Sequence, residues 1–174
     1  MVKALLIIDV QKGMFSAGGP HDSNRVVESL ENVLAKARSS AAEVFFVQHD
    51  GGQSSPLAKG SAGFDYHPAL IPLPSEDVTV KQHCSAFQGT DLLAKLTAAG
   101  VDELVVGGMQ SEFCVDTAVR GAFERGFTVT LIADGHTTFD TPALPAKQIV
   151  AHHNHTLQSG NFAQVVEAEN VGFT

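Results

Sequence analysis

The segment KALLIID, residues 3–9, decides the fold class. Five apolar residues follow one another without interruption and end at the carboxylate of Asp9. A strand with one buried face alternates apolar and polar residues, whereas a strand covered on both faces is apolar throughout. The segment therefore predicts a central parallel strand of an α/β protein, with Asp9 at its carboxyl end.

Strand-like and helix-like segments alternate through the rest of the chain. Short apolar runs predict further strands at residues 44–48, 78–81, 103–107, 128–134 and 162–166. Helical spacing of apolar residues predicts helices at residues 24–37, 91–99, 112–125 and 141–159. The predicted helix caps are Thr90, Ser111 and Thr141 at the amino ends, and Gly100, Gly126 and Gly160 at the carboxyl ends. This alternation is typical of a parallel sheet covered by helices on both faces.

The composition is that of a globular protein. Of the 174 residues, 44% are hydrophobic and 17% are charged, and no internal repeat or linker divides the sequence. We therefore expect a single domain over residues 1–174. Residues 51–74 are rich in Gly, Ser and Pro and predict a long surface loop. Loops of this length in compact domains commonly serve as lids or binding segments.

Charge and hydropathy disfavour several classes of partner. The formal net charge is -8 and the basic residues are scattered, so a phosphate backbone would be repelled. No stretch reaches the ~18 apolar residues of a membrane span. The apolar run at residues 4–8 is also too short for a signal peptide. We therefore expect a cytoplasmic protein that acts on a small-molecule substrate, with no nucleic-acid or membrane partner.

Two cysteines, Cys84 and Cys114, occur in the chain, and they form no Cys-x-x-Cys pair. A reducing compartment disfavours a structural disulfide between them, and the spacing fits neither a zinc ribbon nor a thioredoxin motif. For Cys84 we expect a buried, inert thiol. Cys114 instead lies at the start of a predicted helix, directly after a predicted strand.

Polar side chains gather where the predicted strands end. Asp9, His49, Lys81 and the segments 108–114 and 134–138 all follow strands. In open parallel sheets, ligands bind beyond the carboxyl ends of the strands. The functional residues are therefore expected at this edge.

Cys114 is the candidate nucleophile. If Ser111 caps the helix at residues 112–125, Cys114 occupies its third position, among amide N–H groups without intrahelical partners. The helix would favour the thiolate and lower the pKa of the thiol, and the same N–H groups could bind an oxyanion. The alternative is a small apolar residue packed beneath the helix.

Asp9 and Lys81 could assist such a thiol. A carboxylate after five apolar residues must reach a strand end or a cation, and Asp9 could take the thiol proton. It could equally hold a loop amide. Lys81, after VTV, could keep Asp9 ionised and stabilise a thiolate, or it could face solvent.

Three motifs considered together resemble those of the isochorismatase-like cysteine hydrolases, a family that includes nicotinamidases. They are LLIIDVQ around Asp9, VKQHCSAFQGTDL around Lys81, and GGMQSEFCV around Cys114. The resemblance runs from about residue 4 to residue 166. It implies a Rossmann-like three-layer α/β/α sandwich with a six-stranded parallel sheet in the order 3-2-1-4-5-6, and a homo-oligomer.

The resemblance also implies an active site. Asp9, Lys81 and Cys114 would form a catalytic triad, and a cis peptide would join Met109 to Gln110. The amides of Gln110 and Cys114 would then form the oxyanion hole. Lys81 fits this geometry least well, since the third strand lies ~10 Å from the first.

One departure from the family concerns metal. Nicotinamidases carry an Asp-x-His motif after the second strand with a further His downstream, whereas this chain reads QHDGGQSSP and then Tyr66-His67-Pro68. We therefore predict no metal and no cofactor. His49 and Asp50 could instead line the pocket or orient a loop, and a His49 bonded to backbone is an equal alternative. His152, His153 and His155 are expected at the surface or an interface.

The resulting hypothesis is hydrolysis of a C–N bond in a small amide-like substrate through a thioester on Cys114. The substrate-binding residues are expected to be His49 and four aromatic residues, Phe15, Phe87, Phe113 and Phe139. Two alternatives use the same fold: a non-catalytic protein that binds a small ligand, and a thiol redox protein that uses Cys84 and Cys114.

Overall fold

The computed structural model describes residues 1–16 and 18–173. Its sheet has six strands, all paired in parallel, in the order β3-β2-β1-β4-β5-β6. The strands are β1 Val2–Ile8, β2 Glu43–His49, β3 Asp77–Lys81, β4 Val101–Met109, β5 Thr128–Thr137 and β6 Gln164–Val166. This confirms the predicted fold class and strand order.

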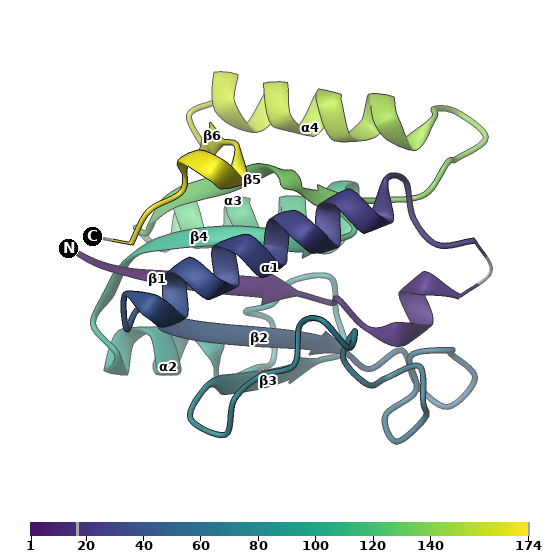
Figure 1. The fold of residues 1–174 in the computed structure, drawn as a ribbon, viewed down its shortest axis with the longest axis horizontal. Helices are drawn as coiled ribbons and strands as arrows, with labels where there is room; N and C mark the ends of the chain where they lie inside the picture. The colour runs from purple at the N-terminus through teal and green to yellow at the C-terminus, as the bar shows by residue number, and fades with distance from the viewer. Residues whose placement is uncertain (17, 174) are drawn as a thin grey trace.

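Helices cover both faces of the sheet. They are α1 Ser23–Ser39, α2 Leu92–Ala98, α3 Asp116–Glu124 and α4 Ala146–Ser159, with shorter helical turns η1 Lys12–Phe15, η2 Ser111–Val115 and η3 Ala168–Asn170. One core cluster joins the sheet to α1 and η3, and the other joins it to α2, α3 and α4. Figure 1 shows α1 in front of the sheet, with α2 and α3 behind it. The three-layer α/β/α sandwich is confirmed.

The central strand shows why an unbroken apolar run identifies this fold. Leu5 and Ile7 pack into the cluster on the α1 side, whereas Leu6 and Ile8 pack into the opposite cluster. All four side chains are at most 1% exposed. Burying each one contributes about 1.5–3 kcal/mol relative to an exposed position, so the strand is stable only between two helical layers.

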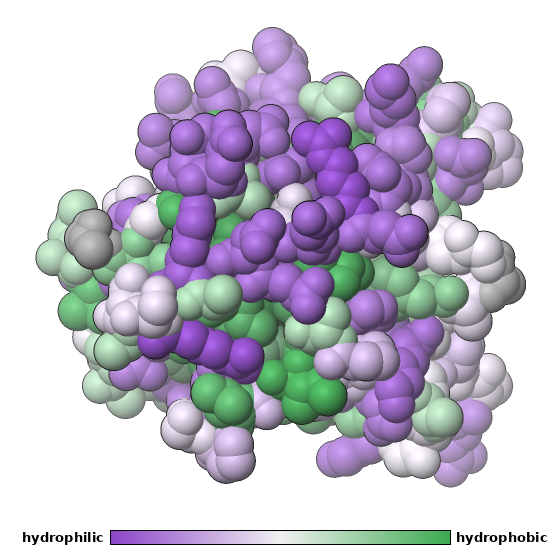
Figure 2. Space-filling model, in the orientation of Figure 1, coloured by the Kyte–Doolittle hydropathy of each residue, from purple (hydrophilic) through white to green (hydrophobic). Residues whose placement is uncertain are grey.

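Helix α1 has the amphipathic pattern expected of a covering layer. Val26, Leu30, Val33 and Ala37 recur at helical spacing and are buried against the sheet. The opposite face carries mainly polar residues, and Figure 2 shows a largely hydrophilic surface over α1. No helix within residues 1–16 and 18–173 is long and apolar enough to cross a membrane.

The start of α4 differs from the prediction. Thr141 does not cap a helix but closes a turn, in which its hydroxyl accepts the N–H of Leu144 at 3.0 Å. The helix begins at Ala146, directly after Pro145. Because proline has no N–H and its ring obstructs the preceding turn, a helix running through Pro145 from Thr141 is disfavoured.

The end of β4 lies unusually close to β1. Gly108 pairs with Ile8, has a φ of 128°, and a Cβ built on it would lie 2.0 Å from the Ile8 carbonyl oxygen. Only glycine fits this backbone conformation and this approach. The segments that follow β1 and β4 therefore leave the sheet side by side.

Candidate active site

Asp9 leaves β1 in a left-handed conformation. Its φ is 52°, and its N–H donates to the Val47 carbonyl at 2.9 Å, so the chain turns while still anchored to β2. The side chain is 4% exposed. The second carboxylate oxygen, Oδ1, is buried and without a hydrogen-bond partner among the described residues. A buried carboxylate oxygen in this state is free to accept a proton.

Lys81 reaches Asp9 across β2. Its side chain is fully buried, and Nζ lies 2.7 Å from Asp9 Oδ2 and 3.1 Å from Cys114 Sγ. The separation of β3 from β1 is bridged by the length of this side chain. Of the two alternatives for Lys81, the structure shows the buried cation rather than the solvent-facing one, and it brings residues 9, 81 and 114 together.

Two further groups hold the Lys81 ammonium. The His83 carbonyl accepts from Nζ at 3.1 Å, and His49 Nδ1 lies 3.2 Å from it. An ammonium only donates, so His49 Nδ1 must accept and the ring proton must sit on Nε2. Burial and the Lys81 charge lower the pKa of His49, which favours this neutral form. His49 thus orients Lys81.

Cys114 lies in the turn η2 rather than in an α-helix. Residues Ser111–Val115 form a π-helical turn, Gln110 is its N-cap, and α3 begins only at Asp116. The prediction that Ser111 caps the helix is therefore wrong. The peptide bond between Met109 and Gln110 is cis, and the Gln110 carbonyl accepts the Val115 N–H at 3.1 Å.

The electrostatics of the thiol also differ from the prediction. Burial and the negative charge of Asp9 raise the pKa of Cys114 to about 12, although Lys81 opposes them. The expected lowering by the helix is wrong because Cys114 is largely buried beside a carboxylate. Burial likewise raises the pKa of Asp9, against the effect of Lys81. The resting thiol is therefore protonated, next to a carboxyl group that can take its proton.

Gln11 ties the long loop to the edge of the sheet. Its fully buried side chain donates to the carbonyls of His49 and Phe64 at 3.1 and 3.0 Å and accepts the His49 N–H at 2.8 Å. Asp50 accepts the N–H groups of Gly52 and Lys59, both at 3.1 Å, so it orients this loop. Sequence reasoning missed Gln11, although it lies two residues after Asp9.

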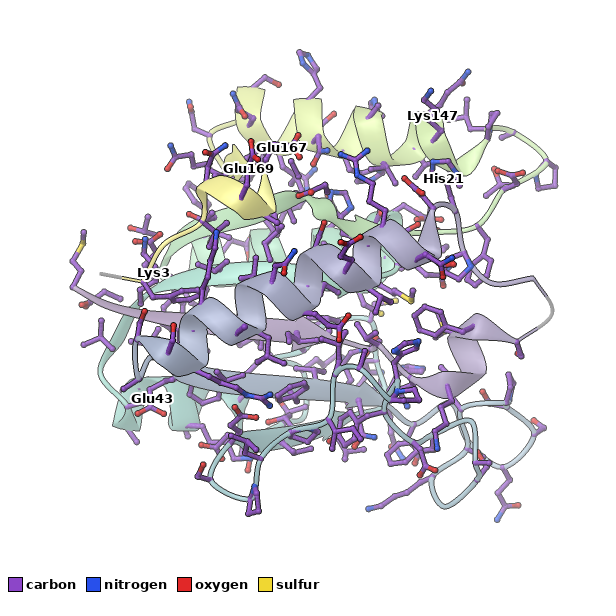
Figure 3. All side chains as sticks on the ribbon, viewed as in Figure 1. Lys3, His21, Glu43, Lys147, Glu167 and Glu169 are labelled. Carbon is purple, nitrogen blue, oxygen red and sulfur yellow. The ribbon has the colours of Figure 1, made fainter. Side chains whose placement is uncertain are left out.

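Polar groups at the end of β5 hold the other side of the nucleophile turn. The Gln110 side-chain amide donates to Thr138 Oγ1 at 3.2 Å, and this hydroxyl donates to Glu112 Oε1 at 2.8 Å. The Thr138 carbonyl accepts the N–H of His21, which Figure 3 labels just before α1. The turn is thus bonded to a residue just beyond β5. The segments 108–114 and 134–138 include Glu112 and Thr138, but sequence reasoning gave neither residue a role.

The predicted aromatic residues divide into two groups. Phe113, on η2, is 48% exposed, and half-buried Phe15 contacts His67 with ring centroids 4.6 Å apart. Phe139 is half-buried just beyond β5. Phe87 is instead a core residue, buried with the Arg125 guanidinium 4.6 Å above its ring.

The structure also places the remaining sulfur and histidines. Cys84 is exposed, so the expectation of a buried thiol is wrong: it lies on the surface loop between β3 and α2, outside both core clusters. His152 and His155 are exposed on α4, as predicted, whereas His153 is half-buried there with Nδ1 2.9 Å from the Ile149 carbonyl. Within the described part of the chain, no three His, Cys, Asp or Glu side chains group together as a metal site.

Comparisons with known proteins identify the family and agree with the fold. The isochorismatase domain model matches residues 3–169. The chain is 40% identical over 145 residues to a streptothricin hydrolase of Streptomyces noursei; the match covers 83% of this chain but only 52% of that hydrolase. It is 35% identical to the isochorismatase family protein YddQ of Bacillus subtilis, covering 89% and 88% of the two chains. An isochorismatase structure from Pseudomonas putida superposes with a TM-score of 0.91 at 29% identity, covering 97% and 89%.

Proposed function

The chain belongs to the isochorismatase family and is a hydrolase, and on that premise we propose that it cleaves a C–N bond of a small amide through a thioester on Cys114. One observation carries the proposal. Lys81 Nζ lies within 3.1 Å of Cys114 Sγ and 2.7 Å of Asp9 Oδ2, in a buried site. A thiol, a carboxylate and an ammonium in contact supply a nucleophile, a base and a fixed positive charge.

The first step is proton transfer coupled to attack. Asp9 Oδ1 has no other partner among the described residues, and it accepts the thiol proton as Sγ bonds to the substrate carbonyl carbon. The raised pKa of Cys114 favours this concerted route over a preformed thiolate, since a free thiolate is disfavoured in the resting site. Lys81 stabilises the negative charge as it passes from carboxylate to sulfur.

The second step expels the amine. The carbonyl oxygen becomes an oxyanion, and we assign the N–H groups of Gln110 and Cys114 as its donors. When the tetrahedral intermediate collapses, the C–N bond breaks and the leaving nitrogen takes the proton held by Asp9. The acyl group remains on sulfur as a thioester.

Water then completes the cycle. Asp9 accepts a proton from water as the water oxygen attacks the thioester carbon. Collapse of this second intermediate breaks the C–S bond and releases the carboxylic acid, and the proton on Asp9 returns to sulfur. The resting thiol and carboxylate are restored, so the cycle consumes one amide and one water.

The test is hydrolysis of a panel of small amides, carbamates and lactams. Streptothricin belongs in the panel, because two relatives from Streptomyces noursei are named streptothricin hydrolases. We expect turnover of at least one compound and an intact-mass adduct of the acyl group on Cys114 when the reaction is quenched early. Cys114→Ala should lose both the turnover and the adduct.

The exposed cysteine provides the matched control. Cys84→Ser removes the other thiol of the chain, and it should keep full activity because Cys84 is exposed, whereas Asp9 and Lys81 of the triad are buried. Retained turnover in Cys114→Ala, with its fold intact by circular dichroism, would contradict the mechanism. Loss of activity in Cys84→Ser, together with a disulfide between Cys84 and Cys114 in the parent protein, would favour a redox function instead.

A further inference from the structure

A second buried polar chain lies behind the nucleophile turn. Ser111 Oγ is 2.8 Å from His136 Nδ1, and His136 Nε2 is 2.8 Å from Asn154 Oδ1. Ser111 and His136 are at most 1% exposed. The three residues come from η2, β5 and α4, so the chain links the nucleophile turn to a helix on one face of the sheet. The proposed reaction uses none of them.

The hydrogen-bond directions along this chain follow from its far end. Asn154 Nδ2 donates to the Ala133 carbonyl at 3.0 Å, so Oδ1 faces His136 and accepts from it. The ring proton of His136 therefore sits on Nε2, and Nδ1 is left to accept the Ser111 hydroxyl. Burial lowers the pKa of His136 to about 4, so the imidazole stays neutral near neutral pH. Each group has one defined role.

An irregularity in β5 makes the arrangement possible. Val106 pairs with Leu131, but Gly108 pairs with His136, so β5 contains extra residues opposite β4. Such a bulge takes a carbonyl out of the ladder and turns the following side chain in a new direction. Here Asn154 binds the freed Ala133 carbonyl, and the same side chain accepts from His136.

We propose that Ser111, His136 and Asn154 form a positioning relay that holds the nucleophile turn against α4 and thereby aims Cys114 and its amide. Ser111 is completely buried and its hydroxyl is bonded to His136, so we assign the relay to act through the turn rather than as a second catalytic group. This inference rests on the proposed function of Cys114. Helix α4 contacts η2 directly, which gives the relay a fixed anchor.

The test compares two variants at one position. Asn154→Leu removes the acceptor for His136 and the donor to Ala133, whereas Asn154→Asp keeps the acceptor. We expect kcat to fall by about 10- to 100-fold in Asn154→Leu with little change in KM, because a displacement of ~1 Å at the reacting atoms has an effect of this size. Asn154→Asp should retain more activity than Asn154→Leu. Ser111→Ala, which removes one hydroxyl, should lower kcat in the same direction.

A second readout requires no substrate. In a Cys84→Ser background, the rate of Cys114 alkylation is followed against pH. We expect its midpoint to move toward the ~8.5 of free cysteine in Ser111→Ala and Asn154→Leu, because the thiol leaves its buried place beside Asp9. The alkylation experiment tests the relay even if no amide in the panel is hydrolysed. A negative result in it would count against the relay, whereas the absence of hydrolysis would count against the proposed function.

The control is Leu157→Ala, which empties a fully buried position on the same helix and removes no hydrogen-bonding group. It should destabilise the protein but leave kcat and the alkylation profile unchanged. Alkylation profiles of Ser111→Ala and Asn154→Leu that superpose on the parent would overturn the proposal. If Asn154→Leu does not fold, the smaller Ser111→Ala change decides the outcome alone.

Discussion

Two lysine–carboxylate pairs lie at opposite ends of the same sheet. Near the amino end of β1, Lys3 Nζ lies 3.2 Å from Glu103 Oε1, with side chains 26% and 11% exposed. At the carboxyl end, Lys81 and Asp9 are 2.7 Å apart, with side chains 0% and 4% exposed. Figure 3 labels Lys3 at the edge away from the site loops. The two pairs use the same chemistry in different surroundings.

The difference shows what burial does to an ion pair. A pair open to water contributes about 0–1 kcal/mol, because water already solvates both charges. A buried pair loses that solvation, and the attraction between its charges repays the loss only in good geometry. The Lys81–Asp9 pair is therefore a weak device for stability. The contact of Lys81 with Cys114 indicates a role for this pair at the nucleophile. The Lys3–Glu103 pair lies at the other end of the sheet and has no such role.

The largest expected effect concerns activity. Lys81→Met keeps the length and apolar stem of the side chain but removes the charge beside the sulfur. We expect kcat/KM to fall by about 10²–10³-fold, the usual effect of losing one preorganised electrostatic group. Lys3→Met should leave kcat/KM unchanged. Steady-state kinetics with a substrate from the amide panel checks both, and a similar loss in Lys3→Met would remove the distinction between the pairs.

Stability should show the next largest difference. Lys81→Met leaves Asp9 buried without its cation, so we expect a loss of about 3–5 kcal/mol in unfolding free energy at neutral pH. Burial raises the pKa of Asp9, and removing Lys81 raises it further. In the folded variant Asp9 then holds a proton that it releases in the unfolded chain. The free energy of unfolding of the variant therefore falls as pH rises above the pKa of Asp9 in the unfolded chain. Urea titrations should show the deficit shrinking towards pH 4, and a deficit independent of pH would contradict this account.

The pH dependence of the unmodified protein separates the two possible states of the thiol. Because burial raises the pKa of Asp9 above 3.8, kcat/KM should fall about tenfold per pH unit on the acid side, below that raised value. Asp9 is then protonated and cannot accept the thiol proton. Since burial and the charge of Asp9 raise the pKa of Cys114 above that of a free cysteine, no rise in kcat/KM should occur around pH 8.5. Such a rise would indicate a preformed thiolate.

The smallest expected effect is at the amino edge. Lys3→Met should change the unfolding free energy by about 1 kcal/mol, because the Lys3 side chain reaches water and Glu103, although largely buried, keeps the Thr130 hydroxyl as a donor to Oε1. The change should shrink further at high salt, which screens exposed charges. Urea titrations at low and high ionic strength measure this. A loss as large as that of Lys81→Met would show that exposure does not explain the contrast.

Much of the fold could be predicted from sequence because it depends on local patterns. The apolar run of β1 predicts a strand buried on both faces, and the helical spacing of α1 predicts a helix with one buried face. Both predictions are confirmed. The start of α4 was missed, since Thr141 and Pro145 each offer a plausible helix boundary and the choice depends on the turn between them.

The relay shows the kind of residue that a single sequence conceals. The run HHNH at residues 152–155 attracts attention to its histidines, yet His152 and His155 are exposed and half-buried Asn154 makes the contacts to His136 and Ala133. Which residue of a helix faces the sheet depends on how the helix is rotated against its neighbours. His136 likewise points to Ser111 only because β5 bulges, and no local pattern marks that bulge.

The sequence by itself indicated the fold class and the approximate position of each strand, because these follow from residue type and its neighbours along the chain. It offered Asp9, Lys81 and Cys114 as candidates, each with a structural alternative, and only the family resemblance joined them into a triad. Only the tertiary structure decided that Lys81 crosses β2 to reach Asp9, and that Cys114 lies in a π-helical turn with a raised pKa. The physical reason is that a pKa depends on burial and on the distances between charges. Residues 9, 81 and 114 become buried and come within contact distance of one another only when the strands pack side by side.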